Sequence, residues 1–418
     1  MAVSPRHEEY DVVIIGAGMV GLSLACMLEK SAPMQPAKIL LLESSHLATD
    51  KARQPGFDAR STVLSYGTIR QLQRLGLWEK LEHFACPITT IHVSDQGRFG
   101  QALISAEAQK VPALGQVLEN QPVGRLLNQV LLESEQVESL SPVQVKHIQH
   151  EATQASLLCH AEGNEFLIRS SLVVLAEGGR SGLCESLGIS RQQKDYKQVG
   201  IIANLAFSEP HHNVAYERFT PSGPLAILPL NDFEGLHRAA LIWTQAAEDY
   251  QAVLQLGDEA FLQKLQQEFG HRLGTISKVG ERHIFPFMLQ QASEQIRHNL
   301  VLLGNTAHTL HPVAGQGFNL AFRDALCLAE NIAESFRLGQ SPGAYARLEK
   351  YVQLVSPDQR HTIGFSHYLT SLFSSEQELL GMSRKFGLIG IDLLPALKNI
   401  LSRQAMGLGN PAAELGRE

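Results

Sequence analysis

The sequence predicts an α/β protein in which a discontinuous Rossmann-like domain carries an inserted β-sheet domain and ends in C-terminal helices. Three observations predict this fold. A glycine-rich strand–turn–helix lies near the N-terminus, two short apolar strands follow far along the chain, and strand patterns dominate the stretch between those two. We therefore expect one sheet assembled from residues 11–43, 171–176 and 299–304.

The first of these segments carries a G-x-G-x-x-G pattern between a strand and a helix. Gly16 is expected to make the turn, Gly18 to leave room for a pyrophosphate, and Gly21 to let the helix pack closely on the strand. The helix, residues 22–30, would present its N-terminal amides to the phosphates. A second strand ends at Glu43, where a carboxylate can accept both adenosine ribose hydroxyls. The pattern predicts that the chain binds an adenine dinucleotide.

The other elements follow from periodicity and turn residues. In the nucleotide-binding domain we expect helices at 68–81 and 123–132, and strands at 143–147, 155–160, 165–168 and 172–175. In the β-sheet domain we expect strands at 88–95, 200–207, 214–220, 225–229, 239–244 and 282–287, and a helix at 258–268. A last apolar strand at 300–303 precedes helices at 317–338 and from about 342 to 406.

These elements predict three regions. The nucleotide-binding domain comprises 1–85, 106–185 and 288–345, the β-sheet domain comprises 86–105 and 186–287, and the C-terminal helical region is 346–418.

Composition excludes several classes of function. Of the 418 residues, 44% are hydrophobic and 18% are charged, and the net charge of -7 argues against nucleic acid as a partner. No run reaches the ~18–20 apolar residues of a membrane span, and the N-terminus has no signal-peptide pattern. The five cysteines form no C-x-x-C pair and the 17 histidines show no H-E-x-x-H spacing. We predict reduced thiols, a cytoplasmic location and no metal.

Three motifs stand in order along the chain: G-A-G-M-V-G at 16–21, A-E-G-G-R-S at 176–181 and G-N-T-A-H-T-L-H-P-V-A-G-Q-G-F-N-L at 304–320. Together they resemble the motifs of the single-component aromatic hydroxylases that carry FAD, over most of the chain. The sequences D-A-R-S at 58–61 and E-R-F-T-P-S-G-P-L-A at 217–226 are most similar to those of the ubiquinone-biosynthesis hydroxylases, in particular to the one acting on 2-polyprenyl-6-methoxyphenol.

This resemblance implies a three-layer ββα FAD-binding domain and an aromatic-ring monooxygenase that uses NAD(P)H and O2. A flavin C4a-hydroperoxide would deliver oxygen to a polyprenylated phenol. The chain has no second G-x-G-x-x-G, so NAD(P)H would bind only transiently. Two departures stand out: Glu177 and Asn305 each replace an Asp of the family pattern, and both keep hydrogen-bonding capacity.

The third motif favours FAD over NAD. The positive end of the helix that opens at Gly317 would stabilise negative charge beside the flavin pyrimidine edge, with the amides of Phe318 and Asn319 as donors. Gly315 and Gly317 would let the backbone approach the ring, and Asn305 would bond a ribityl hydroxyl. The alternative is an ordinary helix N-cap with a solvated Asn319.

The resemblance also assigns roles to a proline and several arginines. Pro312 would lie close to the flavin face where oxygen reacts. Arg60 would lie over the cofactor and Arg125 would contact the FAD phosphates, with surface positions as the alternatives. Arg180 is a weaker candidate of the same kind. Arg218 is a candidate to position a phenolate, against the alternative of a solvent-facing strand arginine.

Two apolar sets bear on the substrate. Eight residues of the inserted region could line a slot for a prenyl tail or simply form core: Phe219, Leu225, Ile227, Leu228, Leu230, Phe285, Phe287 and Met288. The apolar segment 386–401 could pack on the domain, mediate a homo-oligomer or a complex with other ubiquinone-biosynthesis proteins, or make peripheral contact with the inner membrane.

Other functions share the predicted architecture. An FAD-dependent halogenase should carry a W-x-W-x-I-P segment, and the only tryptophans are Trp78 and Trp243. A hydroxylase for another ring position and an FAD-dependent polyprenyl reductase stay open. Because of Glu177 and Asn305, so does a non-catalytic flavoprotein assembly subunit.

Overall fold

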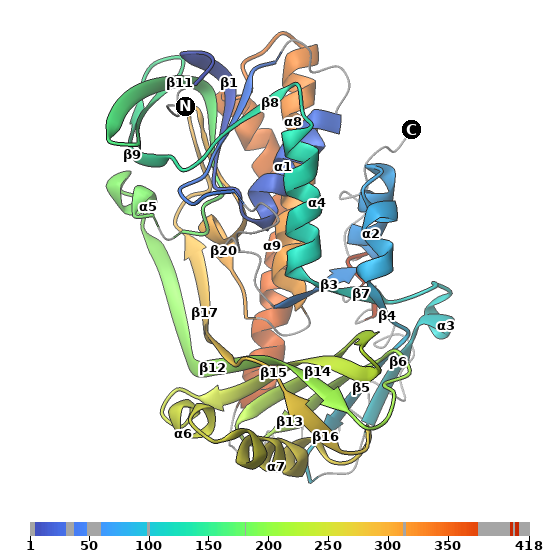
Figure 1. Cartoon of the computed structure of the whole chain (residues 1–418). Coiled ribbons are helices and arrows are strands. Elements are labelled where there is room, and N and C mark those ends of the chain that lie inside the picture. Colours follow the sequence, from blue (N-terminus) through green and yellow to red (C-terminus); the bar gives the residue numbers. More distant parts are fainter. Residues whose placement is uncertain are drawn as a thin grey trace.

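A computed structural model describes residues 5–30, 37–47, 60–97, 101–179, 181–311, 315–374, 402–403 and 406–408, and for 368–374 it describes the backbone alone. Figure 1 shows two halves, an upper one in which long helices pack on a sheet and a lower one in which a second sheet carries short helices beneath it. In the described part of the chain, no helix is both long enough and apolar enough to cross a membrane.

The first sheet contains the nucleotide-binding strands. In the described residues its strand order is β18-β19-β11-β1-β2-β8, and β10 and β9 extend it from β11. Its strands are β1 (Glu9–Ile15), β2 (Ile39–Leu42), β8 (Val137–Leu140), β9 (Gln144–His150), β10 (Ala155–Ala161), β11 (Asn164–Leu175), β18 (Ile296–Arg297) and β19 (Leu300–Leu302). β1 runs parallel to both β11 and β2, and β11 runs parallel to β19. The prediction of one sheet from three separated segments is confirmed.

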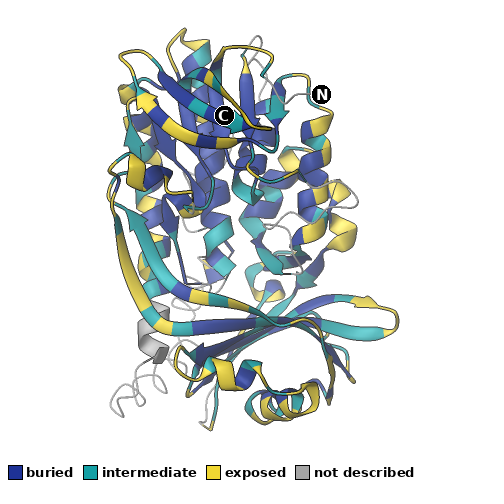
Figure 2. Cartoon of the chain, turned by 60° about the vertical axis from the view of Figure 1, so that its left-hand side comes forward, coloured by how far each residue is buried: buried dark blue, intermediate teal, exposed yellow. Residues whose placement is uncertain are grey.

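This half has three layers. The helices α1 (Met19–Lys30), α4 (Asn120–Leu132) and α8 (Gln316–Arg337) share one apolar core with alternate residues of the central strands, such as Val12 and Ile14. The intervening residues, such as Val13, pack on the other face against β9 and β10. A long helix, α9 (Tyr345–Ser374), runs beside α8. The predicted ββα layering follows because the central strands carry apolar residues on both faces. Figure 2 shows that these strands are buried.

The second sheet has the order β20-β17-β12-β15-β14-β13-β5-β6, with β16 beside β12. Its strands are β5 (Thr90–Asp95), β6 (Gln101–Ser105), β12 (Arg191–Phe207), β13 (Val214–Thr220), β14 (Gly223–Phe233), β15 (Leu236–Ala246), β16 (Ile276–Val279), β17 (His283–Ala292) and β20 (His308–Thr309). The helices α6 (Tyr250–Leu254) and α7 (Asp258–Phe269) cover its lower face, where residues such as Trp243 and Phe261 are fully buried.

A small third sheet lies between these halves and was not predicted. It consists of β3 (Ser61–Ser65), β7 (Gly115–Glu119) and β4 (Cys86–Ile88), in the order β3-β7-β4. Because β4 pairs with β7, residues 86–88 do not join the second sheet as the predicted boundary implied. The chain also forms two short helices, α3 (Ala106–Gln109) and α5 (Leu183–Ser186), and a 3-10 turn, η3 (Gly304–Thr306). The division of the chain into a nucleotide-binding domain, a β-sheet domain and a C-terminal helical region stays a proposal.

Two element predictions need correction. The helix expected over 68–81 is α2 (Tyr66–Arg74), followed by 3-10 turns η1 (Trp78–Lys80) and η2 (Glu82–Phe84), because Gly76 adopts φ +64° and ends the helix. The separate strands expected at 165–168 and 172–175 are the single strand β11, whose first half pairs with β10 and whose second half pairs with β1.

Candidate active site

Three motifs that lie far apart in the sequence meet at the carboxyl ends of β1, β11 and β19. A Cβ atom built on Gly16 would lie 2.7 Å from the carbonyl oxygen of Ala176, and the amide of Gly178 donates to the Thr306 hydroxyl at 3.1 Å. In open α/β sheets, ligands bind outside the carboxyl ends of the parallel strands. The three motifs therefore form one candidate site.

The three fingerprint glycines differ in their surroundings. Gly16 has φ +106°, and Gly21 packs so closely that a Cβ there would lie 1.9 Å from the Gly16 carbonyl oxygen. A Cβ on Gly18 would meet no atom within 4 Å among the described residues. The fold itself requires glycine at 16 and 21, whereas the open space at Gly18 fits a pyrophosphate at the N-terminus of α1.

The Glu43 carboxylate lies at the end of β2, against the same loop. Its Oε2 accepts a hydrogen bond from the Ala17 amide at 2.7 Å, and its Oε1 accepts one from the Ser45 amide at 2.9 Å. Each carboxylate oxygen has two lone pairs and can accept a further bond. The carboxylate is thus held beside the glycine loop, and its contact with a ribose stays a prediction.

The N-terminus of α8 follows the third motif. Gly315 is its N-cap at φ +61°, with no side-chain cap, and the first turn has no acidic residue. The positive end of this 22-residue helix is therefore not neutralised by its own side chains. A Cβ on Gly317 would meet no atom within 4 Å in the described structure. This end of α8 fits the negatively charged edge of a cofactor ring.

Asn319 fixes the first turn of α8 against β3. Its Oδ1 accepts hydrogen bonds from the Ser65 amide and the Thr68 hydroxyl, both at 2.8 Å. Its Nδ2 donates to the carbonyl oxygens of Val63 at 2.7 Å and Gly315 at 2.8 Å. The side chain is 1% exposed, which contradicts the solvated alternative, and its amide is fully used within the protein.

The backbone amides of this helix end have different roles. The helix begins at Gln316 with Gly315 as N-cap, so the amides of Gly317 and Phe318 precede the first donor within the helix and point out of the helix end. The Asn319 amide follows them directly, and its contact with a flavin stays a prediction.

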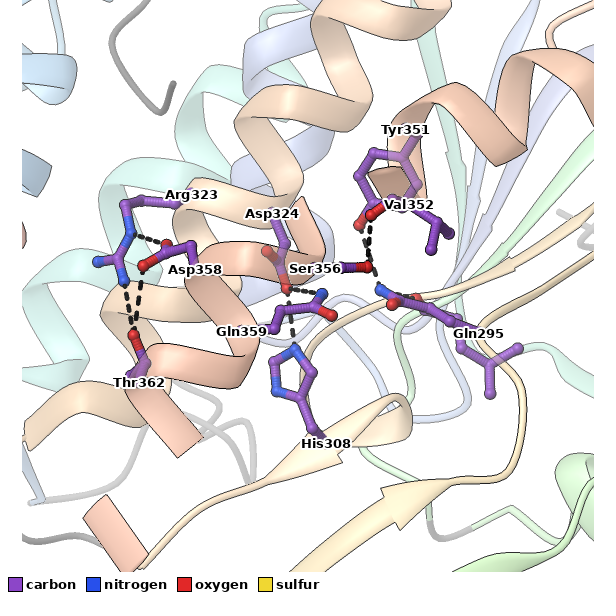
Figure 3. Close-up of polar contacts among 11 residues, drawn as sticks. Gln295, His308, Arg323, Asp324, Tyr351, Val352, Ser356, Asp358, Gln359 and Thr362 are labelled. Atoms are coloured by element: carbon purple, nitrogen blue, oxygen red, sulfur yellow. Dashed lines mark hydrogen bonds and ion pairs between the residues drawn. The ribbon is translucent and has the colours of Figure 1, made fainter. Parts of the chain in front are cut away.

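A buried polar network anchors the third motif to the helices behind it (Figure 3). His308 Nε2 lies 2.9 Å from Oδ2 of Asp324 on α8, and Gln359 of α9 donates to the same oxygen at 2.9 Å. One position earlier on each helix, Arg323 Nε pairs with Asp358 at 2.6 Å. These five side chains are each less than 9% exposed. They hold residues 304–311, α8 and α9 as one unit.

The structure describes only some of the remaining predicted site residues. The Arg60 guanidinium lies 5.8 Å from the ring centre of Phe285, so it spans from the first half to the second sheet. Asn305 is exposed at the motif, and Arg125 is exposed on α4. Their contacts with a cofactor stay predictions. Pro312, Arg180 and the segments 58–59 and 386–401 lie outside the described residues.

Arg218 does not lie where the prediction requires it. Its Nε donates to the carbonyl oxygen of Glu268, at the end of α7, at 2.7 Å. It therefore points to the lower face of the second sheet, away from the first half. Side chains alternate along a strand, so the neighbouring Glu217 points to the upper face instead.

The apolar candidates for the substrate slot also lie on different faces of the second sheet. Leu225 and Ile227 belong to the fully buried core between the lower face and α7, which contradicts their role in a slot. Leu228 and Leu230 pack on the upper face with residues of the small third sheet. Phe287 lies against His311, with ring centres 4.4 Å apart.

Sequence reasoning missed His311 as a member of the site. It is 1% exposed, burial lowers its pKa to about 4, and the Tyr196 ring lies edge-on at 5.2 Å. Tyr196 in turn bonds His367 of α9 at 3.0 Å. The available signal was the position of His311 directly before Pro312 in the third motif.

Comparisons with known proteins agree with this geometry. A family model described as "FAD binding domain" matches residues 9–360. Ubiquinone hydroxylase UbiL of Rhodospirillum rubrum is 32% identical, over 95% of this chain and 89% of its own length. The ubiquinone biosynthesis monooxygenase COQ6 of Danio rerio is 28% identical, over 94% and 89%. The crystal structure of p-nitrophenol 4-monooxygenase PnpA from Pseudomonas putida superposes with a TM-score of 0.75 at 16% identity, over 97% of this chain and 100% of that one, which shows the shared fold.

Proposed function

Because this chain belongs to the FAD binding domain family of flavoproteins, we propose that it is an FAD-dependent monooxygenase of ubiquinone biosynthesis. Its substrate would be a polyprenylated phenol of the 2-polyprenyl-6-methoxyphenol type, hydroxylated on the ring with NAD(P)H and O2. Relatives that carry the names ubiquinone hydroxylase and ubiquinone biosynthesis monooxygenase match it over most of its length, and they support this assignment.

One observation carries the proposal. The fingerprint loop and the N-terminus of α8 lie at the same edge of the first sheet, and each contains a glycine next to open space, Gly18 and Gly317. A dinucleotide with a charged pyrophosphate in its middle and a flavin at one end needs both. An NAD-binding fold would use the first and leave the second unexplained.

The residues present fit FAD. Gly18 and the α1 N-terminus would receive the pyrophosphate, Glu43 the ribose, and the amides of Gly317 and Phe318 the pyrimidine edge of the flavin. When bound, FAD would pass two electrons from NAD(P)H to O2 and so supply the oxygen atom that is transferred. The protein's task is to hold the phenol beside it and exclude water.

The upper face of the second sheet suits an apolar substrate. Ile202, Leu228 and Ile242 lie on this face and are half-buried, whereas residues of the lower face are fully buried. We infer that the phenol lies between this face and the N-terminus of α8. The prenyl tail would follow the apolar side chains.

The test is turnover by the purified protein. It should retain FAD, and 2-prenylphenol should accelerate NAD(P)H oxidation and oxygen uptake, with formation of a hydroxylated ring. A yellow protein that consumes NADPH without O2 and saturates prenyl double bonds would point to a reductase. A protein that binds FAD but oxidises neither nicotinamide with any prenylphenol would point to an assembly subunit. Either result contradicts the proposal.

The physiological substrate is a separate question. Quinone profiling of a deletion strain should show one accumulated polyprenylphenol, which identifies the substrate of this enzyme. Unchanged ubiquinone and no accumulated phenol would contradict a role in that pathway.

A further inference from the structure

Glu217 occupies the middle of β13 and faces the cofactor half of the molecule. Its neighbours Tyr216 and Arg218 both contact α7, Tyr216 through the ring of Phe269 at 5.5 Å. Ala215, two residues before Glu217, instead belongs to the apolar cluster on the upper face. Because side chains alternate along a strand, Glu217 shares the face of Ala215.

This face is connected to the N-terminus of α8. The cluster that contains Ala215 also has Val63 packed against it. The Val63 carbonyl accepts a hydrogen bond from Asn319, and a Cβ built on Gly315 would lie 3.0 Å from the Val63 side chain. β13 therefore presents Glu217 on the same side as the helix end to which the flavin is assigned.

The carboxylate lies in an apolar row. Across the sheet, Glu217 is opposite Val93 of β5 and Ala226 of β14, and Ala226 is followed by Ile242 and Ile202. These in-register residues share one face, and Val93, Ile202 and Ile242 are half-buried. Burial of a carboxylate among such groups is unfavourable unless something compensates it.

No side chain or backbone group of the described structure compensates the burial of the Glu217 carboxylate. Among the residues that the structure describes, none forms a hydrogen bond or an ion pair with Glu217. Burial alone raises the pKa of this carboxyl group to about 7. Ion-paired carboxylates such as that of Asp195, which lies beside Lys197, have lowered pKa values instead. A desolvated acid or base without a protein partner is typical of a functional site.

We propose that the Glu217 carboxylate receives the phenolic hydroxyl of the substrate, first as a hydrogen-bond acceptor and then as the acceptor of its proton. The O–H electron pair stays on the phenol oxygen and enriches the ring at the position to be hydroxylated. When the hydroxylated ring releases its C–H proton to water, Glu217 returns its proton to the oxygen. NAD(P)H and O2 supply the electrons and the oxygen atom, so this inference rests on the proposed function.

The test compares a phenol with its methyl ether. 2-Prenylphenol and its O-methyl ether have the same tail and ring, and only the first can donate to Glu217. A site built to bond a hydroxyl rejects the analogue that lacks it by a large factor, here expected to be on the order of 100-fold or more in kcat/KM. In Glu217→Leu this discrimination should fall to within about threefold.

A second variant separates binding from proton transfer. Glu217→Gln can still accept a hydrogen bond but cannot take the proton, so KM for the phenol should stay within about threefold while kcat falls by roughly 100-fold. The control is Tyr216→Phe, which removes a hydroxyl from the adjacent residue on the opposite face and should leave the ratio, KM and kcat unchanged. FAD absorbance and thermal unfolding of each variant show whether it is folded.

The outcomes are distinct. Retention of the wild-type phenol-to-ether ratio in both Glu217 variants would overturn the assignment of Glu217 and leave the proposed function intact. An equal loss in Tyr216→Phe would also overturn it, because a structural effect on β13 would then explain the result. A wild-type protein that binds FAD but oxidises NAD(P)H with neither compound would overturn both the proposed function and this inference.

Discussion

At the scale of single residues, glycines of one motif have different physical tasks. Gly21→Ala would put a methyl group 1.9 Å from the Gly16 carbonyl oxygen, and we expect it to lower the free energy of unfolding by about 3 kcal/mol. Gly18→Ala meets open space, so stability should change by less than about 0.5 kcal/mol. Its methyl group would occupy the expected pyrophosphate position, so FAD affinity should fall by about 10-fold or more.

Thermal unfolding of the FAD-free protein and fluorescence titration with FAD measure these two effects. A Gly18→Ala protein that binds FAD as tightly as the wild type would show that the pyrophosphate lies elsewhere.

His311 makes stability depend on pH. Burial favours its neutral imidazole and lowers its pKa to about 4, while in the unfolded chain the pKa is near 6.5. The unfolded state therefore binds the proton first. Stability that is present above about pH 6.5 is lost as the pH falls toward 4, by up to about 3 kcal/mol.

Denaturant unfolding of wild type and His311→Gln between pH 4 and 7 measures this contribution. The variant should show the shallower pH dependence. Parallel curves for the two proteins would mean that the imidazole becomes protonated equally easily in both states.

At the scale of elements, α8 is positioned by its side chains as well as by its core. Asn319→Ala would leave the buried Ser65 amide and Val63 carbonyl without this partner, and we expect a loss of about 2–4 kcal/mol. The change lies at the end of α8 that faces the cofactor, so FAD affinity should fall as well.

A matched control exists on the same helix. Asn331 is also buried and donates to the Arg347 carbonyl oxygen at 3.1 Å, but it lies three turns further along α8. Asn331→Ala should lower the melting temperature and leave FAD affinity unchanged. Equal loss of FAD affinity in both variants would show that overall stability, and not the placement of the helix end, controls binding.

At the scale of the whole molecule, the long strand β12 joins the halves. β12 begins beside the middle motif, where Arg191 Nη1 donates to the Gly179 carbonyl oxygen, and it continues into the centre of the second sheet (Figure 1). Glu119 of the small third sheet adds a second link, because it accepts from Asn204 at 3.1 Å and pairs with Arg238 at 3.1 Å. The upper face of the second sheet is therefore held at a fixed position relative to the site.

The sequence by itself determined the features that depend on local pattern. The strand–glycine–helix context predicted the loop at Gly16, and apolar runs predicted the three parallel strands, because both signals come from residues close together in the chain. The prediction of one helix over 68–81 was wrong. The apolar residues of this segment are buried as their spacing indicates, but the helical backbone ends at Gly76.

Only the tertiary structure decided which side chains face the cofactor half. The strand 214–220 has no clear alternation, and a period of two defines two faces without telling which face a distant helix will cover. The packing of α7 beneath the second sheet turned Arg218 away and left Glu217 facing inward. Likewise, no local signal paired Asn319 with Ser65 across 254 positions, because such contacts exist only once the chain has folded.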